Sequence, residues 1–108
     1  MKSVTVRTAR SSAPILASAS PNPFNPETAI SYTVRGTGPV TLRVYSIDGR
    51  LVRTLKYGEM TTAGTHEVRW NGANDHSQPV SSGIYFVRTD QRVGNAEESA
   101  VLKLTLTK

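Results

Sequence analysis

The stretch Val40-Thr41-Leu42-Arg43-Val44-Tyr45-Ser46-Ile47-Asp48-Gly49-Arg50-Leu51-Val52 decides the fold class of this chain. Its first half alternates Val40, Leu42 and Val44 with other residues, and this period of two is typical of a half-buried strand. Asp48-Gly49 then separates two apolar runs, and an Asp-Gly pair in that position is a strong hairpin signal. The stretch therefore predicts two antiparallel strands joined by a tight turn.

The same period of two continues on both sides of this hairpin. Further apolar runs comprise Ile30, Tyr32 and Val34; Val68 and Trp70; Gly83-Ile84-Tyr85-Phe86-Val87; and Ala100, Leu102, Leu104 and Leu106. Turn formers separate them at residues 36–39, and we expect a glycine-bearing loop over residues 56–64 and a polar loop over residues 71–82. Roughly six to eight short strands without helical periodicity indicate an antiparallel β-sandwich or a small barrel.

The segment Pro21-Asn22-Pro23-Phe24-Asn25-Pro26 precedes the first of these runs. Its prolines fix φ and remove amide donors, so neither a helix nor a central strand is expected there. We predict a rigid extended lead-in with Phe24 closing one end of the core. Residues 21–108 then form one domain, and residues 1–20 are a linker or the end of an upstream region, with a candidate first strand at residues 4–8.

Composition narrows the class of protein. The 108 residues fit a single domain, and the absence of cysteine excludes disulfides and thiolate metal sites. The 13 Lys and Arg against 8 Asp and Glu give a net charge of +5, which favours anionic partners without naming one. Arg43, Arg69 and Arg88 either lie on solvated strand faces or form one basic sheet face that docks an anionic partner. Nucleic acid is not expected, because neither a recognition helix nor a series of exposed aromatic residues is indicated.

No apolar run is long enough to span a membrane, and the apolar stretch at residues 13–17 is too short for a signal peptide. If the module is exported, we expect the signal to lie upstream in a longer parent chain.

Candidate chemical groups are few. His66 and His76 match no zinc pattern and are expected on a strand and at a loop tip. Asp75-His76-Ser77 lacks the G-x-S-x-G elbow that presents a nucleophile. Glu97-Glu98 would face opposite sides of a strand or lie solvated in a loop, so they form no acid–base pair. We therefore predict no catalytic residue, no metal ligand and no cofactor.

The segments Gly36-Thr37-Gly38 and Asn71-Gly72-Ala73-Asn74-Asp75 have two interpretations each. The first lacks the helix and lysine of a phosphate-binding loop and is predicted to be an inter-strand turn. The second offers several oxygen donors that a calcium ion could use, although only one is a carboxylate. The alternative is that these Asn and Asp side chains cap turns.

Three segments together resemble a known family. Pro21 to Ile30 resembles its PNPFNP-x-T-x-I opening, Leu42 to Val52 its V-Y-D-x-x-G-r-x-V strand pair, and Ala63-Gly64-Thr65-His66 to Trp70 with Ser82-Gly83-Ile84-Tyr85-Phe86 its A-G-x-H…W and S-G-x-Y-F segments. The family comprises the immunoglobulin-like modules grouped as the FlgD-type domain and the type IX secretion-system C-terminal sorting domain (type A). The resemblance covers about residues 16–108.

The resemblance implies an immunoglobulin-like antiparallel β-sandwich of about seven strands, with no catalytic residues. It further implies a C-terminal module that directs secretion and cell-surface anchoring of a larger exported bacterial protein. Its partners would be the secretion translocon, the attachment machinery and an upstream cargo domain, with no nucleic acid and no membrane-spanning segment. The module would pass through the periplasm and reach the cell surface or the medium.

Residue roles carry over from the matching positions only. The structural motif comprises Pro21, Asn22, Pro23, Phe24, Tyr45, Gly49, Gly64 and Trp70, and the sorting motif comprises Gly83, Tyr85, Lys103 and Lys108. The chain departs from the family's W-D-G-x-D-x-x-G pattern after Trp70, and Glu97, Glu98 and Ser99 stand where basic residues are common.

Two other functions remain open. One is a structural module of the flagellar hook-cap type. The other is an accessory carbohydrate-binding sandwich of a secreted hydrolase, which would need coplanar exposed aromatic residues. Aromatic residues make up only 6% of the chain, and most fall at predicted core positions.

Overall fold

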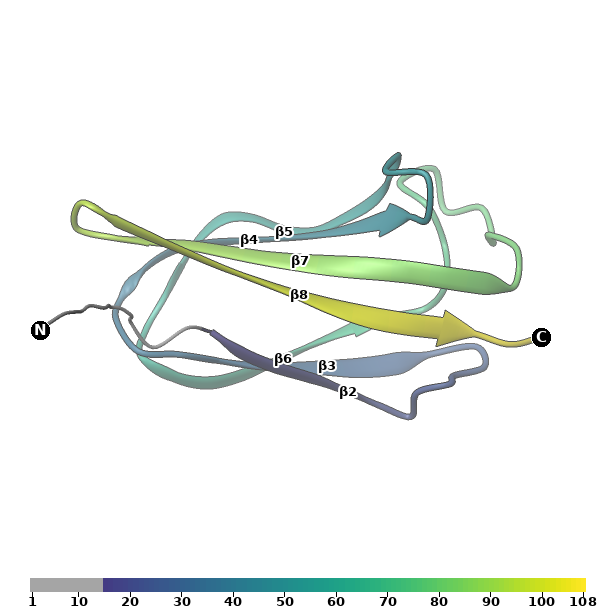
Figure 1. The fold of residues 1–108 in the computed structure, drawn as a ribbon, viewed down its shortest axis with the longest axis horizontal. Helices are drawn as coiled ribbons and strands as arrows, with labels where there is room; N and C mark the ends of the chain where they lie inside the picture. The colour runs from purple at the N-terminus through teal and green to yellow at the C-terminus, as the bar shows by residue number, and fades with distance from the viewer. Residues whose placement is uncertain (1–14) are drawn as a thin grey trace, which may run out of the picture.

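The computed structural model describes residues 15–108, which form two antiparallel sheets facing one another (Figure 1). One sheet has the order β2-β3-β6 and the other the order β5-β4-β7-β8. The strands are β2 (Leu16–Ser20), β3 (Thr28–Val34), β4 (Gly38–Ser46), β5 (Leu51–Thr61), β6 (Gly64–Trp70), β7 (Gly83–Val93) and β8 (Ala96–Leu106). The prediction of an immunoglobulin-like sandwich of about seven strands is confirmed. The candidate strand at residues 4–8 lies outside the described residues.

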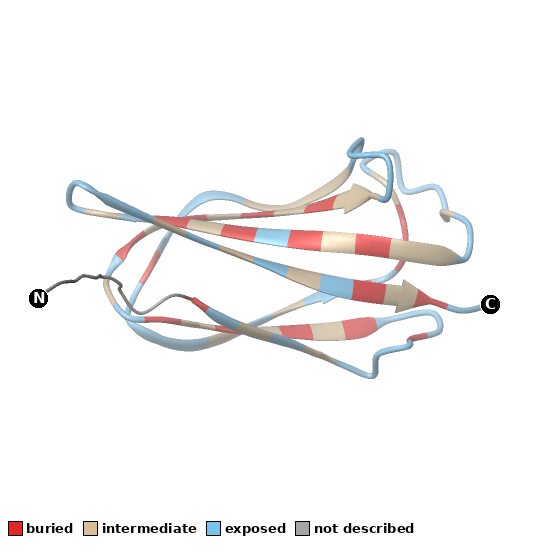
Figure 2. Ribbon diagram, viewed as in Figure 1, coloured by how far each residue is buried: buried red, intermediate tan, exposed pale blue. Residues whose placement is uncertain are grey.

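The core lies between the sheets and is built from the alternating residues that the sequence marks. Buried positions recur at every second residue along β3, β4 and β7, as the banding in Figure 2 shows. Fully buried apolar side chains include Ile30, Leu42, Val44, Val87 and Leu104, each 0% exposed. Each contributes roughly 1.5–3 kcal/mol through removal of its surface from water, so packing can hold the domain without disulfides.

The hairpin between β4 and β5 is confirmed. The Gly49 amide donates to the Ser46 carbonyl at 2.9 Å, and the Ser46 amide donates to the Arg50 carbonyl at 2.9 Å. Gly49 has φ 86°, a left-handed conformation that glycine adopts at little cost. The Asp48-Gly49 signal therefore marks the turn correctly.

The loop expected over residues 56–64 is wrong for most of its length. β5 continues to Thr61, which pairs with Gly38 of β4, and only Thr62 and Ala63 separate β5 from β6. The pairing of β4 with β5 shifts register at several points, and Gly58, at φ 60°, donates its amide to the Thr41 hydroxyl at 2.9 Å. Gly58 thus accommodates an irregularity inside β5. From the sequence alone, this glycine predicted that the strand had already ended in a loop.

The hairpin between β7 and β8 turns at Gly94-Asn95 and has an unbroken register from Gly83↔Leu106 to Val93↔Ala96. Glu97 and Glu98 therefore lie on a strand, which is one of the two settings expected for them. The polar loop at residues 71–82 connects β6 to β7 as expected.

The proline-rich segment lies beside the last strand. Phe24 is 1% exposed and forms an isolated parallel bridge with Leu106 of β8, so its expected position at the end of the core is confirmed. Immediately before this segment, β2 pairs with β3, and Ile15 is buried at 4% exposure. The sandwich therefore includes residues from Ile15 onward.

Candidate recognition surface

The four residues of the expected sorting motif lie near one end of the sandwich, where β7 begins and β8 ends. Gly83 pairs with Leu106, and Tyr85 pairs with Leu104. Lys103 pairs with Phe86, and Lys108 follows the end of β8. The fold thus brings together residues separated by up to 25 positions in sequence. Their role in recognition stays a prediction.

Only part of this motif is available to a partner of the folded domain. Lys103 and Lys108 are exposed, whereas Tyr85 is 7% exposed. The Tyr85 hydroxyl donates to the Ser81 carbonyl at 2.7 Å, and its ring meets Trp70 edge-on at 5.4 Å. Tyr85 therefore supports the surface from within. Gly83 has φ 152°, and a Cβ added there would meet nothing within 4 Å, so backbone conformation and not space calls for glycine.

Asn22 and Phe24 hold the outward edge of β8 at this end. The Phe24 amide donates to the Thr105 carbonyl, and the Thr107 amide donates to the Phe24 carbonyl, both at 2.9 Å. The Asn22 carboxamide repeats this pattern two residues earlier, since it donates to the Lys103 carbonyl and accepts from the Thr105 amide, each at 2.9 Å. The side chain of Asn22 thus serves as a strand partner. The sequence motif includes Asn22 but indicates no role for its side chain.

An aromatic cluster connects this segment to the core. Phe24 lies 5.5 Å from Trp70, measured between ring centroids, and Trp70 lies between Phe24 and Tyr85 in the chain of ring contacts. The Trp70 indole donates to the Ala73 carbonyl at 2.9 Å. These contacts bury large rings and satisfy the only polar atom of the indole, so the end of the sandwich is rigidly packed.

The oxygen donors of the loop at residues 71–78 are engaged within the protein. Asn71 Oδ1 accepts from the Ala73 amide at 3.2 Å, and Asn74 Oδ1 accepts from the amides of His76 and Gln78 at 2.9 and 3.0 Å. Asp75 Oδ1 accepts from the Thr54 amide at 3.0 Å. The bonds of Asn71 and Asn74 are those of turn-capping side chains, the second of the two interpretations, whereas the bond of Asp75 reaches β5. Within residues 15–108, no group of three or more His, Cys, Asp or Glu side chains is placed to hold a metal ion.

Asp75 also protects the edge of the four-stranded sheet opposite β8. Its amide donates to the Val52 carbonyl of β5 at 3.0 Å, and its carboxylate accepts from the next outward amide, that of Thr54. Arg53 adds a bond from its guanidinium to the Asn74 carbonyl at 3.1 Å. Both edges of this sheet are therefore partly covered at the end of the sandwich where the C-terminus lies. Asp75 covers β5, and Asn22 with Phe24 covers β8.

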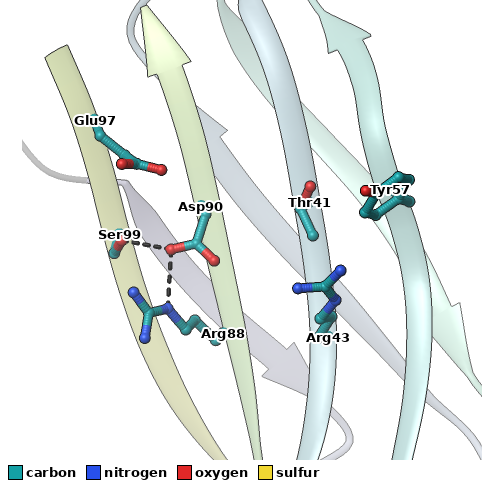
Figure 3. A pocket seen from close by; sticks show the side chains of 7 residues that line it. All are labelled: Thr41, Arg43, Tyr57, Arg88, Asp90, Glu97 and Ser99. Carbon is teal, nitrogen blue, oxygen red and sulfur yellow. Dashed lines mark hydrogen bonds and ion pairs between the residues drawn. The ribbon is translucent and has the colours of Figure 1, made fainter. Parts of the chain in front are cut away.

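The outer face of the four-stranded sheet carries a shallow polar groove of about 480 Å³ (Figure 3). Arg43 and Arg88 are direct neighbours across β4 and β7, whereas Arg69 lies on β6 in the other sheet. Arg43 is half-buried with its guanidinium 5.3 Å from the centroid of the exposed Tyr57 ring. The three arginines therefore do not form one basic face.

Arg88 in this groove is neutralised locally by a carboxylate. Its Nε donates to Asp90 Oδ1 at 2.9 Å, and the Ser99 hydroxyl also bonds this carboxylate oxygen. The hydrogen bond and charge of Asp90 raise the pKa of Arg88. The groove thus carries both positive and negative side chains. It has no concentrated positive patch that would support binding of an anionic partner.

The histidines lie as expected on a strand and in a loop. His66 of β6 stacks on Tyr32 at 5.7 Å, and its Nε2 bonds the Thr62 carbonyl at 2.7 Å. His76 is exposed in the loop after Trp70.

Burial raises the pKa of Tyr32, and the hydrogen bond to Glu59 raises the pKa of Lys56. In the part of the chain that the structure describes, no helix is long and apolar enough to cross a membrane.

The chain is similar to one known domain family in sequence and to several solved structures in fold. The sequence matches the model of the FlgD Ig-like domain over residues 25–106. No curated protein matches the chain. Among solved structures, dimeric latent PorU from Porphyromonas gingivalis is similar with a TM-score of 0.70 and 18% identity, covering 94% of this chain and 10% of PorU.

Two further structures share the fold. FlgD from P. aeruginosa has a TM-score of 0.62 and 18% identity over 73% of this chain and 61% of FlgD. PorZ, described as an essential bacterial surface component of the type-IX secretion system of Porphyromonas gingivalis, has a TM-score of 0.56 and 21% identity over 85% of this chain and 11% of PorZ. This chain therefore spans less than two thirds of each of these proteins.

Proposed function

The chain belongs to the FlgD Ig-like domain family, and from this premise we propose that it is a non-catalytic module that directs a larger exported protein through the type IX secretion system to the cell surface. The upstream part of the parent chain would be the cargo. The module itself would be the address that the translocon and the surface-attachment machinery recognise.

One observation carries the proposal: the end of β8 is held in a fixed position while its charged side chains face solvent. Asn22 and Phe24 bind the backbone of β8 at Lys103 and Thr105 and the backbone of Thr107 just after the strand. Lys103 remains exposed on the outer face, and Lys108 lies beyond the strand with its ammonium donating to the Val80 carbonyl. A preformed and rigid arrangement lowers the entropy cost of recognition, which suits an address.

The likeness to PorZ supports a connection with secretion through fold alone, because the identity is 21%. The likeness to FlgD supports the competing proposal of a flagellar hook-cap scaffold at 18% identity. The type IX proposal ranks first because it also uses the sorting motif at Gly83, Tyr85, Lys103 and Lys108. For the carbohydrate-binding alternative, the groove offers a single strongly exposed aromatic ring, that of Tyr57.

The lysines can be tested without disturbing the fold. Removing several C-terminal residues would delete Leu104 and Leu106, which are 0% and 1% exposed, and would unfold the domain. We therefore expect the double variant Lys103→Gln, Lys108→Gln, fused behind a fluorescent reporter, to fold normally and to lose about tenfold in surface display in a type IX-competent bacterium.

Arg69→Gln is the matched control, because it removes a positive charge from the outer face of the other sheet. We expect its display to equal that of the unsubstituted module. Equal display of the double lysine variant and the control would show that Lys103 and Lys108 take no part in recognition.

A further inference from the structure

The outward backbone groups of β8 have hydrogen-bond partners along only about half of the strand. Residues 22 and 24 bond it at Lys103 and Thr105, and they also bond Thr107 just after the strand. We propose that the other half, residues 97–101, receives an extended segment of a partner polypeptide, which adds as a further strand to the four-stranded sheet. The inference rests on the proposed function and names how the export machinery would hold the module.

The ladder itself defines which groups face outward. Thr105 directs both its amide and its carbonyl away from β7, toward Asn22 and Phe24. In an antiparallel pair, successive residues direct both groups alternately toward one neighbour and the other. The register between β7 and β8 has no shift, so Val101, Ser99 and Glu97 also direct their amides and carbonyls outward.

Within residues 15–108, no hydrogen bond reaches the outward backbone groups of these three residues. A row of donors and acceptors at this spacing is matched by an extended polypeptide, which is why a free edge strand is a template for strand addition. The chain already demonstrates this mode on the same edge, because Phe24 pairs with Leu106 in parallel.

The remaining edge strands are poorer templates. β2 has 5 residues and β6 has 7, against 11 for β8. β5 also has 11 residues, but its pairing with β4 shifts register repeatedly, and Asp75 covers it at Val52 and Thr54. Irregular spacing and covered amides both oppose strand addition.

The side chains beside the free edge indicate which side chains a complementary partner strand would have. Val101 is 64% exposed on the outer face, so an apolar neighbour would cover it. Glu97 is exposed on the same face beside its cross-strand neighbour Arg92, with which it forms no ion pair within residues 15–108, and Glu98 is half-buried on the other face. The complementary partner is therefore an extended segment with an apolar residue opposite Val101 and a basic residue close to Glu97.

Val101→Pro tests the edge directly, because proline at an outward-facing position removes an edge donor while the bonds to β7 remain. In the reporter assay, we expect a folded Val101→Pro module to lose about tenfold or more in surface display. Val101→Thr, which keeps the amide and weakens only the side-chain contact, should lose about two- to threefold. Equal display of Val101→Pro and the unsubstituted module would overturn the inference.

A charge variant keeps the test decisive if the proline variant does not fold. We expect Glu97→Lys to reduce display several-fold and Glu67→Lys, on β6 of the other sheet, to leave it unchanged. Equal display of both variants would contradict the partner chemistry. If the unsubstituted reporter is not displayed at all, the proposed function fails instead.

A deletion of residues 1–14 identifies the occupant. If a partner covers the edge, Val101→Pro should reduce display equally with and without these residues. If the deletion abolishes the effect of Val101→Pro and lowers the melting temperature, the chain's own N-terminal segment is the occupant and the inference is wrong.

Discussion

At the scale of single residues, Asn22 explains why a proline-rich segment can complete a sheet. Pro21 and Pro23 cannot donate backbone hydrogen bonds, yet the β8 edge beside them needs a donor at Lys103 and an acceptor at Thr105. The carboxamide supplies both from one side chain. Asparagine is thus required by its paired donor and acceptor, and not only by its preference for turns.

We expect Asn22→Leu to destabilise the domain by about 0.5–1.5 kcal/mol, because it removes two exposed hydrogen bonds to β8 that water replaces only in part. Hydrogen exchange at the Thr105 amide should accelerate, and chemical denaturation should report the lost free energy of unfolding. The control is Asn25→Leu, at an exposed position of the same segment. Equal effects of both substitutions would show that the carboxamide bonds do not matter.

The β4–β5 turn carries a prediction for pH dependence. The hydrogen bond from the Ser46 hydroxyl holds the pKa of Asp48 below its usual 3.8. Because the pKa is lowered in the folded state, the ionised carboxylate stabilises the turn above pH 3.8, and this contribution is lost as the pH falls through the lowered pKa.

Ser46→Ala should therefore raise the pKa of Asp48 toward 3.8 and flatten the acid dependence of stability in that window. An NMR titration of the Asp48 carboxyl measures the shift, and Ser18→Ala on β2 is the control. An unchanged Asp48 pKa in Ser46→Ala would refute this account of the turn.

At the scale of elements, glycines act in two physically different ways. Gly38 is buried at the start of β4, and a Cβ there would lie 1.9 Å from the Arg92 carbonyl oxygen of β7. Gly49 has open space around it and is needed only for its φ of 86°. The first glycine allows two strands to approach, and the second allows a chain to turn.

We expect Gly49→Ala to cost about 1 kcal/mol of stability, the price of a left-handed conformation for alanine. Gly38→Ala should cost at least about 3 kcal/mol, because the backbone of β4 or β7 must move. Thermal unfolding of the two variants checks the order. A smaller loss for Gly38→Ala than for Gly49→Ala would contradict the close approach.

Sequence patterns predicted the elements well where the strands are regular. Alternation located β3, β4, β6 and the end of β8, and Asp48-Gly49 located the first long hairpin. The second hairpin, between β7 and β8, was not predicted, although Gly94-Asn95 is itself a hairpin signal. The predicted end of β5 was too early, because a glycine inside a strand and a glycine in a loop look alike without the partner strand.

The candidate surface was predictable only in part. The family resemblance assigns Gly83, Tyr85 and Lys103 to one motif, but burial of Tyr85 depends on which side of β7 faces the core. The side-chain pairing of Asn22 with Lys103 and Thr105 joins positions more than 80 apart and has no local pattern. Such long-range contacts follow from the fold and not from spacing.

At the scale of the whole molecule, the four-stranded sheet has a covered end and an open end. Asp75 covers β5, and Asn22 with Phe24 covers β8, both near the C-terminus of the chain. The opposite end leaves the β8 edge at residues 97–101 without partners within residues 15–108. This asymmetry gives the module one rigid end that displays lysines and one edge that can accept a strand.

If this sandwich is an export address, it should carry a passenger protein to the cell surface only through a working translocon. The most direct measurement is surface display of a fluorescent reporter that carries residues 1–108 at its C-terminus, compared between a type IX-competent bacterium and its translocon-deficient twin. We expect surface fluorescence in the competent strain alone. Intact, folded reporter retained in the periplasm of both strains would contradict it and would favour the hook-cap scaffold.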